Sequence, residues 1–277
     1  MNLSICAPNK QFKNKKTCFS LNSLKKIATS YNKKVNSNNK IPISNDINVL
    51  HSNIKKKLSK VCTGEVCWAN QSFVKELNDD EINYLTFKPV RPVGKNQWLS
   101  TTDIKKVMLQ YEKKFTDFVF LGPVPIDFDD IQTEISNLSL QELKAKGINK
   151  IGIVFNLDEH YKSGSHWVAL YMEFSNNKKE INYFDSYGDN PVKRIEVLMN
   201  RLIKNAKNEL NISVTKNINR TRTQFAHSEC GVYSMNFILH LLMGDSFRET
   251  TQNIINDEEM TNRRNLFFRS NSSLQTI

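Results

Sequence analysis

Apolar residues form three strand-like runs in the second half of the chain. Residues 151–156, 167–174 and 180–184 are rich in β-branched and aromatic side chains, which is typical of buried strands. The polar stretch 175–179 separates the last two runs and predicts a hairpin turn. We therefore expect an antiparallel hairpin among these strands.

Helical patterns surround the strands. Residues 231–243 are apolar and free of proline, with Gly244 as a stop signal, and predict a buried helix. Residues 211–218 favour a strand and residues 257–268 a C-terminal helix. Two further predicted helices, 102–115 and the stretch that Pro191 opens, are amphipathic: their apolar faces contain Ile104, Val107, Met108 and Tyr111 in the first, and Ile195, Leu198, Leu202 and Ile203 in the second. The alternation indicates an α+β fold with a central sheet packed by helices.

The net charge is confined to the N-terminal fifth of the chain. Residues 1–60 hold 13 Lys and a single acid, Asp46, whereas the remaining 217 residues hold 26 basic and 27 acidic residues. Helical spacing from Leu21 to Ala28, with Ser20 as a cap, and a second stretch at 51–61 suggest that part of this segment is helical. We expect residues 1–60 to form a basic, Lys- and Asn-rich extension, either partly disordered or a tether to DNA or another polyanion. Residues 61–277 then form the main domain, with its core at about 85–270.

Four residues carry the candidate chemistry, in the order His166, Asp185, Gln224, Cys230. A thiol beside an imidazole that a carboxylate orients is an activated nucleophile. His166 precedes one strand of the hairpin and Asp185 follows the other, and antiparallel pairing brings these two ends together. Cys230 begins the apolar helix, where the positive end of the helix dipole favours a thiolate. Gln224 and the Cys230 amide are donors suited to an oxyanion.

Other residues have competing interpretations. Each of the four residues alone is compatible with a structural role, and their joint order and spacing favour catalysis. His227 lies in the loop of Cys230 without a strand to position it, and no carboxylate pairs with His160 at a spacing comparable to that of His166 and Asp185. Glu229 is equally explained as an acid at a helix N-terminus. The acidic residues 127–130 predict a surface loop or helix start, with a metal or acid–base site as the alternative.

These motifs resemble those of the ubiquitin-like-protein (SUMO) protease and adenovirus protease clan of cysteine peptidases. The likeness rests on His-Trp at 166–167, Gln six residues before Cys230, Glu-Cys-Gly at 229–231, and Trp-Leu-Ser-Thr-Thr-Asp-Ile at 98–104. It extends to the thiol proteases of large cytoplasmic DNA viruses, including the polyprotein protease of African swine fever virus, and covers residues 85–270 well. Some viral relatives have Asn where this chain has Asp185. The resemblance implies a papain-like core and a His166–Asp185–Cys230 triad.

The resemblance also implies what the enzyme cleaves. Trp98 and Trp167 correspond to indoles that line a narrow tunnel, so cleavage is expected after small pairs such as Gly-Gly or Gly-Ala. Two protein substrates fit: a viral polyprotein cleaved during virion maturation, or a ubiquitin-like modifier released from conjugates. The alternatives are a polyanion-binding virion protein with a vestigial protease domain, and an acetyltransferase that uses the same triad. We expect the protein in the virion and the host cytoplasm, with no cofactor.

The cysteine pattern and the hydropathy set further limits. Five cysteines at positions 6, 18, 62, 67 and 230 are odd in number and scattered, which argues against a secreted disulfide framework and favours a reducing compartment. Cys62 and Cys67 are spaced like half of a zinc site, but no second pair of ligands follows, so we expect no metal. No segment approaches the roughly 20 apolar residues that a membrane span needs, and no secretion signal is present.

Overall fold

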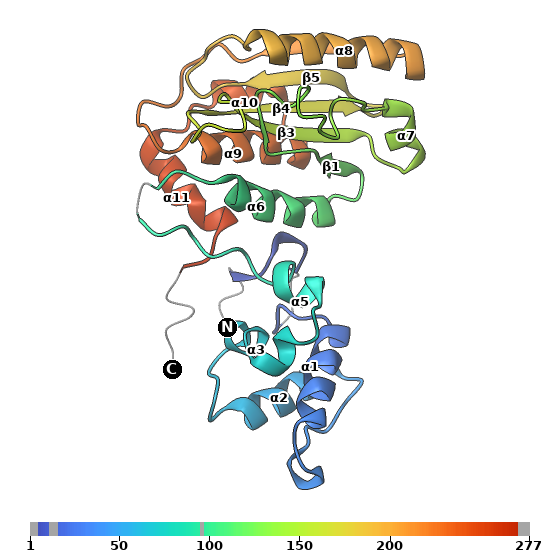
Figure 1. The fold of residues 1–277 in the computed structure, drawn as a ribbon, viewed down its shortest axis with the longest axis vertical. Coiled ribbons are helices and arrows are strands. Elements are labelled where there is room, and N and C mark those ends of the chain that lie inside the picture. The colour runs from blue at the N-terminus through green and yellow to red at the C-terminus, as the bar shows by residue number, and fades with distance from the viewer. Residues whose placement is uncertain (1–4, 11–15, 95–96, 271–277) are drawn as a thin grey trace. The chain divides into compact units, whose positions relative to one another are not determined.

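The chain forms two compact units. The computed structural model describes residues 5–10, 16–94 and 97–270, and Figure 1 follows them from the N- to the C-terminus. One unit contains residues 1–91 together with 265–277, and the other contains residues 92–264. The predicted quartet lies wholly in the second unit, which is described first.

A mixed sheet forms the centre of the second unit. Its strands are β1 (Phe118–Phe120), β2 (Val124–Pro125), β3 (Lys150–Asn156), β4 (Trp167–Phe174), β5 (Lys179–Phe184) and β6 (Thr215–Ile218). The order is β1-β3-β4-β5-β6, and β2 also pairs with β3. β3, β4 and β5 are antiparallel neighbours, whereas β1, β2 and β6 pair in parallel. The three predicted central strands are thus confirmed. β6 begins later than predicted because Asn211 adopts a left-handed conformation and ends the preceding helix.

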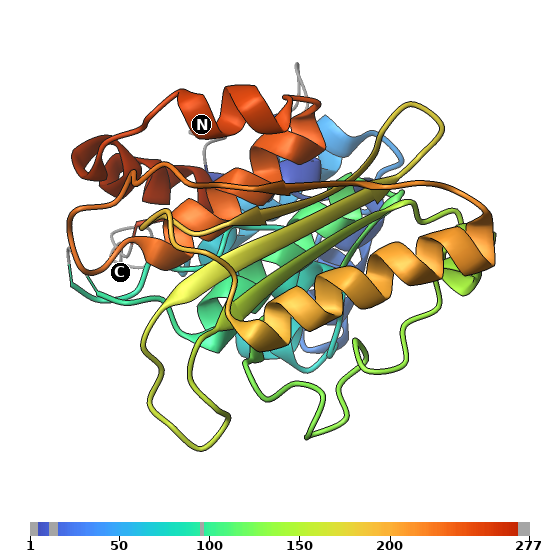
Figure 2. The same cartoon turned by 90° about the horizontal axis from the view of Figure 1, so that it is seen from above.

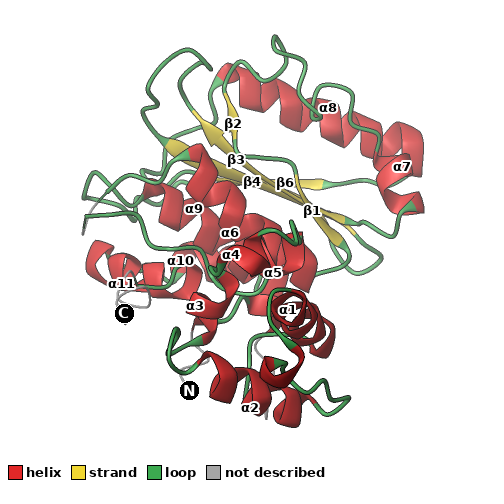
Figure 3. Ribbon diagram, turned by 60° about the horizontal axis from the view of Figure 1, so that its bottom comes forward, coloured by secondary structure: helices red, strands yellow, loops and turns green. Residues whose placement is uncertain are grey.

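Helices cover both faces of this sheet. α8 (Lys193–Leu210) lies along one face, whereas α9 (Cys230–Met243) and α6 (Thr101–Lys114) lie on the other (Figures 1 and 2). Figure 3 shows the strands between these two layers. The shorter helices are α7 (Leu140–Ala145) and α10 (Phe247–Gln252), and α11 (Asp257–Phe267) follows them. The predicted α+β fold with a helix-packed central sheet is confirmed.

Burial of β4 on both faces explains its apolar sequence. Every residue of β4 is buried. Alternate side chains, from Val168 to Phe174, join the core cluster that also contains the inner face of α8. Gly152 on neighbouring β3 has no side chain because a Cβ there would lie 2.7 Å from the Phe118 ring. Helix and sheet layers therefore fix the ends of β4 and β5 rigidly, and the site lies at those ends.

The N-terminal unit is helical. It contains α1 (Leu21–Lys33), α2 (Ile47–Leu58), α3 (Glu65–Ala69), α4 (Ser72–Lys75) and α5 (Asp80–Tyr84), with 3₁₀ turns at Pro8–Lys10 and Ser37–Asn39. Ser20 caps α1 as predicted, by accepting from the Ser23 amide. One core joins residues before and after position 60, among them Leu24, Leu50 and Trp68. The chain therefore divides after Arg91 and not after residue 60, and the described part of residues 1–60 is folded.

Four of the five cysteines in this chain are paired. Disulfides join Cys6 to Cys18 and Cys62 to Cys67, while Cys230 is free and buried. The expectation that these cysteines form no disulfide framework is therefore wrong. Pairing depends on Cα separations of 5.3 and 5.6 Å that the fold creates and that spacing in the sequence does not reveal. Cys62 and Cys67 bind each other, which rules out their use as half of a zinc site.

Neither a metal-binding cluster nor a membrane span appears in the described part of the chain. Its His, Cys, Asp and Glu side chains form no group that could hold a metal ion. None of its helices combines the length and apolar character that crossing a bilayer requires.

Candidate active site

The end of the β4–β5 hairpin brings His166 and Asp185 together. Ala169 pairs with Phe184, and extending this register places His166 opposite Tyr187, beside Asp185. The His166 Nε2 atom lies 2.7 Å from Asp185 Oδ1, and both side chains are buried. The predicted proximity of the two residues is confirmed, and it follows from antiparallel pairing alone.

Cys230 completes the group at the first turn of α9. Its side chain is 1 % exposed. Because Asp185 occupies Nε2, the imidazole faces the thiol with Nδ1. Burial by itself would lower the pKa of His166, but the hydrogen bonds with Asp185 and Cys230 outweigh it and raise that pKa from 6.5 to about 9. At neutral pH the imidazole is therefore charged, and it faces the sulfur of Cys230.

The turn Asp185–Ser186–Tyr187 contacts both sides of the site. The Tyr187 amide donates to Asp185 Oδ1 over 2.8 Å, which fixes the carboxylate. The Tyr187 ring stacks on His166, with centroids 4.5 Å apart and an interplanar angle of 11°. No motif in the sequence assigned a role to Tyr187 or Ser186. The register of β4 against β5 would have indicated Tyr187, because it places residue 187 opposite His166.

Ser186 orients Gln224, the predicted oxyanion donor. The Ser186 hydroxyl donates to Gln224 Oε1 over 2.6 Å, so the amide nitrogen of the fully buried Gln224 side chain must point the other way. That nitrogen donates one hydrogen to the Ala226 carbonyl over 2.7 Å. The second hydrogen is available to an incoming oxygen. The Gln224 backbone amide also donates to the Ser186 carbonyl, so these two hydrogen bonds connect the loop that contains Gln224 to the turn that contains Ser186.

A buried ion pair anchors the residue before Cys230. Glu229 and Arg264 are 1 % and 0 % exposed, and two of the guanidinium nitrogens donate to the carboxylate over 2.8 and 3.1 Å. Arg264 also donates to the Ser228 carbonyl. Glu229 is therefore more than an acid near a helix dipole. It ties the start of α9 to α11, and nothing in the sequence around position 264 indicates this role.

Trp98 and Trp167 line one pocket beside the site. The pocket has a volume of about 460 Å³ and also includes Leu99 and Gly164. Trp167 is buried, and its indole donates to the Leu99 carbonyl over 3.0 Å. Trp98 is 43 % exposed. A side chain at Gly231 would come within 3.3 Å of Leu99 and Trp167, so glycine there lets α9 approach them closely.

His160, discounted in the sequence, does have a carboxylate partner. Its Nδ1 lies 2.6 Å from Asp127 Oδ2 at the rim of the same pocket. Spacing along the sequence does not indicate this pair, because the loop 127–130 returns to His160 from 33 positions away. Asp129 binds Arg201 and Asp130 pairs with Arg194, so the acidic stretch serves as an anchored loop. His227 is exposed.

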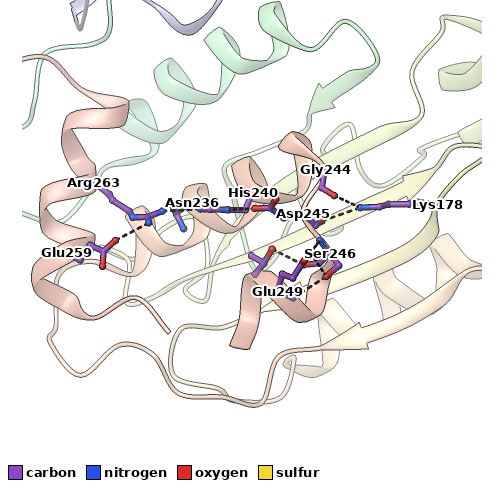
Figure 4. Close-up of polar contacts among 10 residues, drawn as sticks. Lys178, Asn236, His240, Gly244, Asp245, Ser246, Glu249, Glu259 and Arg263 are labelled. Carbon is purple, nitrogen blue, oxygen red and sulfur yellow. Dashed lines mark hydrogen bonds and ion pairs between the residues drawn. The ribbon is translucent and has the colours of Figure 1, made fainter. Parts of the chain in front are cut away.

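Polar contacts fix the far end of α9 as well (Figure 4). Lys178, in the β4–β5 turn, donates to the Gly244 and Asp245 carbonyls that follow the helix. The His240 ring lies between Asp245, 2.6 Å from Nδ1, and Arg263, 3.0 Å from Nε2. Since Nε2 accepts from Arg263, Nδ1 carries the hydrogen that Asp245 accepts. Both ends of the helix that carries Cys230 are therefore held against neighbouring elements.

Comparison with known proteins supports this fold and shows the family. The model of the Ulp1 protease family, C-terminal catalytic domain, matches residues 144–274. Thiol protease R355 of Acanthamoeba polyphaga mimivirus is 33% identical over 289 residues, covering 98% of this chain and 95% of the relative. The SUMO-1 cysteine protease S273R of African swine fever virus is 27% identical over 79% of this chain and 88% of its own. The crystal structure of that virus's pS273R protease superposes with a TM-score of 0.69 at 23% identity, over 96% of both chains, which shows a common fold.

A thiol, an imidazole and a carboxylate at the edge of a helix-packed sheet define a cysteine protease. The extended similarity to R355 then places the protein more narrowly: this chain belongs to the Ulp1 protease family and groups with its viral members.

The pKa of His166 predicts its titration. The wild-type imidazole should titrate near pH 9, and Asp185→Asn or Cys230→Ala should lower the midpoint, because each removes a partner that favours the cation. Since the folded-state pKa lies above 6.5, the charged ring contributes stability that is complete below pH 6.5 and is lost as the pH rises to about 9. NMR of the histidine side chains measures the midpoint directly. A wild-type midpoint at or below 6.5 contradicts the prediction.

The Glu229–Arg264 pair predicts a large loss of stability on truncation. Arg264→Ala leaves a buried carboxylate without its partner, and we expect the free energy of unfolding to fall by about 3–5 kcal/mol. Arg248→Ala is the matched control, because that exposed arginine donates only to the side chain of Gln252 at the surface of α10 among the hydrogen bonds described, and its loss should cost less than about 1 kcal/mol. Urea unfolding of both variants measures the difference. Equal midpoints would show that the buried pair contributes little.

Proposed function

We propose that this chain is a cysteine endopeptidase with Cys230 as nucleophile and His166 as general base and acid. The thiolate attacks the scissile carbonyl, and the resulting oxyanion accepts hydrogen bonds from the Cys230 amide and from Gln224. The His166 imidazolium gives its proton to the leaving nitrogen, the C–N bond breaks, and a thioester remains on Cys230. Neutral His166 then takes a proton from a water that attacks the thioester carbonyl, the C–S bond breaks, and the acyl product leaves as a carboxylic acid. The thiolate of Cys230 and the His166 imidazolium are thereby restored. Asp185 holds the ring and stabilises its cation.

One observation carries this proposal: the buried His166–Asp185 hydrogen bond, which leaves Nδ1 for Cys230. A vestigial domain would not need a charged imidazole beside a buried thiol, since burying that charge costs free energy unless it is used or paired. Acetyl transfer uses the same triad but also needs an acyl-donor site, and no feature described above favours one.

The substrate is a protein with small residues before the scissile bond. Trp98 and Trp167 line one pocket, and Trp167 directly follows His166, so we take this pocket as the place of the residues before the scissile bond, where bulky indoles favour Gly-Gly or Gly-Ala pairs over residues with larger side chains. The names of the relatives include a SUMO-1 protease, so a ubiquitin-like modifier is one candidate. We favour a viral polyprotein or core precursor cleaved during virion maturation, because the enzyme also has a strongly basic unit.

Location in the virion and host cytoplasm follows from the same proposal. Disulfides persist in oxidising surroundings, which include the surface and interior of released particles, more readily than in cytosol. The two disulfides of the N-terminal unit support a mature enzyme packaged in the virion after synthesis in the cytoplasm.

Substitution of the quartet tests the mechanism. Cys230→Ala and His166→Ala should each abolish cleavage of a Gly-Gly peptide, and Gln224→Ala should lower kcat by about 10²–10³. Asp185→Asn should be milder, because an amide oxygen still accepts from the imidazole. Single-turnover assays with mass spectrometry of the products measure these effects. Full activity in Cys230→Ala would refute the assigned nucleophile, and an unchanged rate in Gln224→Ala would refute the oxyanion donor.

We further propose that the N-terminal unit binds polyanions such as DNA. Residues 1–91 and 265–277 hold 17 basic and 6 acidic residues, whereas residues 92–264 hold 22 of each. Carboxylates already pair with Lys10, Lys26 and Lys34. The end of α2 has a different character: Lys55, Lys56 and Lys60 are exposed within six positions of one another. This cluster is the better candidate for phosphate contacts.

Charge-neutralised full-length variants test this binding. Deletion of residues 1–60 is unsuitable because it would remove half of a shared core. The triple variant Lys55→Gln, Lys56→Gln, Lys60→Gln should weaken duplex DNA binding and reduce the log–log salt dependence by about 0.9 for each lost phosphate contact. Gln at Lys10, Lys26 and Lys34 is the control with the same net charge. Equal binding by both variants, or binding independent of salt, would contradict a site on α2.

A further inference from the structure

Four side chains form a continuous stack that begins at the catalytic imidazole. Tyr187 stacks on His166, and the Arg222 guanidinium carbon lies 5.3 Å from the Tyr187 ring centroid and 4.9 Å from the Phe225 ring centroid. Burial and the charge on Cys230 raise the pKa of Tyr187, whereas Arg222 acts in the opposite direction. The charges of Cys230 and Arg222 therefore both act on Tyr187, so this residue connects Arg222 to the reacting groups.

Arg222 is held in place yet lacks an acidic partner. Its Nε donates to the Gln224 carbonyl over 2.9 Å, and two rings restrict the guanidinium plane. Within the described residues no carboxylate forms an ion pair with it. Asp257 contacts the same loop, but its carboxylate accepts hydrogen bonds from the Phe225 and Ala226 amides. A guanidinium so positioned presents its terminal nitrogens to solvent with little conformational entropy left to lose.

The surroundings of Arg222 favour a negative ligand. Residues 219–228 contain Arg220, Arg222 and His227 and no acidic residue. Phe225 is 66 % exposed, which is unusual for a phenylalanine and adds an apolar surface beside the charge. The pocket on the Trp98 side has a mixed character, since Asp158 and Glu159 line it together with Lys162, which pairs with Glu159. An unpaired positive charge therefore distinguishes the Arg222 side.

The chemistry of the reaction indicates which part of the substrate meets this stack. His166 must protonate the leaving nitrogen, so that nitrogen lies next to the imidazole when the C–N bond breaks. Tyr187 adjoins the His166 imidazole, and Arg222 adjoins Tyr187. The substrate residues that follow the leaving nitrogen therefore extend past Tyr187 and then past Arg222. The acyl portion lies on the side of the two tryptophans.

We propose that Arg222, which contacts the rings of both Tyr187 and Phe225, is a specificity-determining residue that binds an acidic side chain within the first three positions after the scissile bond. This inference rests on the proposed endopeptidase function and assigns it a substrate preference. A charge-assisted hydrogen bond to a pre-positioned guanidinium should raise kcat/KM about tenfold, which corresponds to about 1.4 kcal/mol.

Peptides that differ at one position at a time test the preference. Each contains Gly-Gly before the bond and Glu, Gln or Lys at the first, second or third position after it. The wild-type enzyme should cleave the best Glu peptide about tenfold faster than its Lys counterpart in kcat/KM, and added salt should reduce this ratio. Arg222→Gln should bring the ratio close to one, and Arg222→Glu should reverse it in favour of Lys. Arg220→Gln, an exposed arginine in the same loop, should keep the wild-type ratio.

The reversal separates charge recognition from damage to the loop. A distorted loop would slow all peptides together, whereas only a direct contact changes the order of Glu and Lys. Equal wild-type rates for Glu and Lys peptides at all three positions, or a Glu preference that survives in Arg222→Glu, would overturn the inference while leaving the protease assignment intact. A wild-type enzyme that cleaves none of these peptides would overturn both.

Discussion

The hydrogen bond between His166 and Asp185 is the interaction on which the site depends. Both groups are buried, so a charge on either is costly unless the other, or Cys230, compensates it. Compensation requires positions accurate to a fraction of an ångström, and side chains on loops do not hold such positions unaided. The register of β4 against β5 supplies them, because a slip by one residue would turn every side chain of the hairpin to the opposite face. The core on both sides of β4 prevents that slip.

The same constraint explains why so many polar contacts surround the nucleophile helix. α9 carries Cys230 at one end, and a small rotation of this helix would separate the thiol from Nδ1. Its start is held by the buried Glu229–Arg264 pair and by the close approach at Gly231, and its end by Lys178 and the His240 contacts. Buried ion pairs contribute little net stability compared with apolar packing, but they define one arrangement. For a thiolate–imidazolium pair a single arrangement is the requirement.

The central strands and the quartet were predictable from the sequence because their signals are local or ordered along the chain. β4 matches its apolar run at both ends, and Cys230 begins the helix whose end Gly244 marks. Tyr187, Arg264 and the His160–Asp127 pair were not predictable, since each depends on a tertiary contact that leaves no pattern near the residue. The N-terminal unit was misjudged for a different reason. Its helices α3–α5 are four or five residues long, too short for periodicity, and its lysine content hides a core centred on Trp68 and two disulfides.

A Cys-His-Asp triad cleaves peptide bonds but hardly distinguishes one substrate from another. A narrow substrate entry adds only selection by side-chain size. Glycine before the scissile bond offers no side chain to bind, so the entry can reject bulky residues without recognising any particular protein. A missing or extra methylene changes discrimination by only about 1–3 kcal/mol, whereas a buried or pre-positioned polar group can discriminate more strongly. Selectivity for one substrate must therefore come from groups on either side of the bond. The described residues offer one such group in Arg222, whose guanidinium lies beyond the imidazole and has no carboxylate partner. A substrate with an acidic residue after the bond would meet this charge, whereas one with a basic residue there would meet a like charge. The same group that attracts the correct sequence therefore also excludes the wrong one.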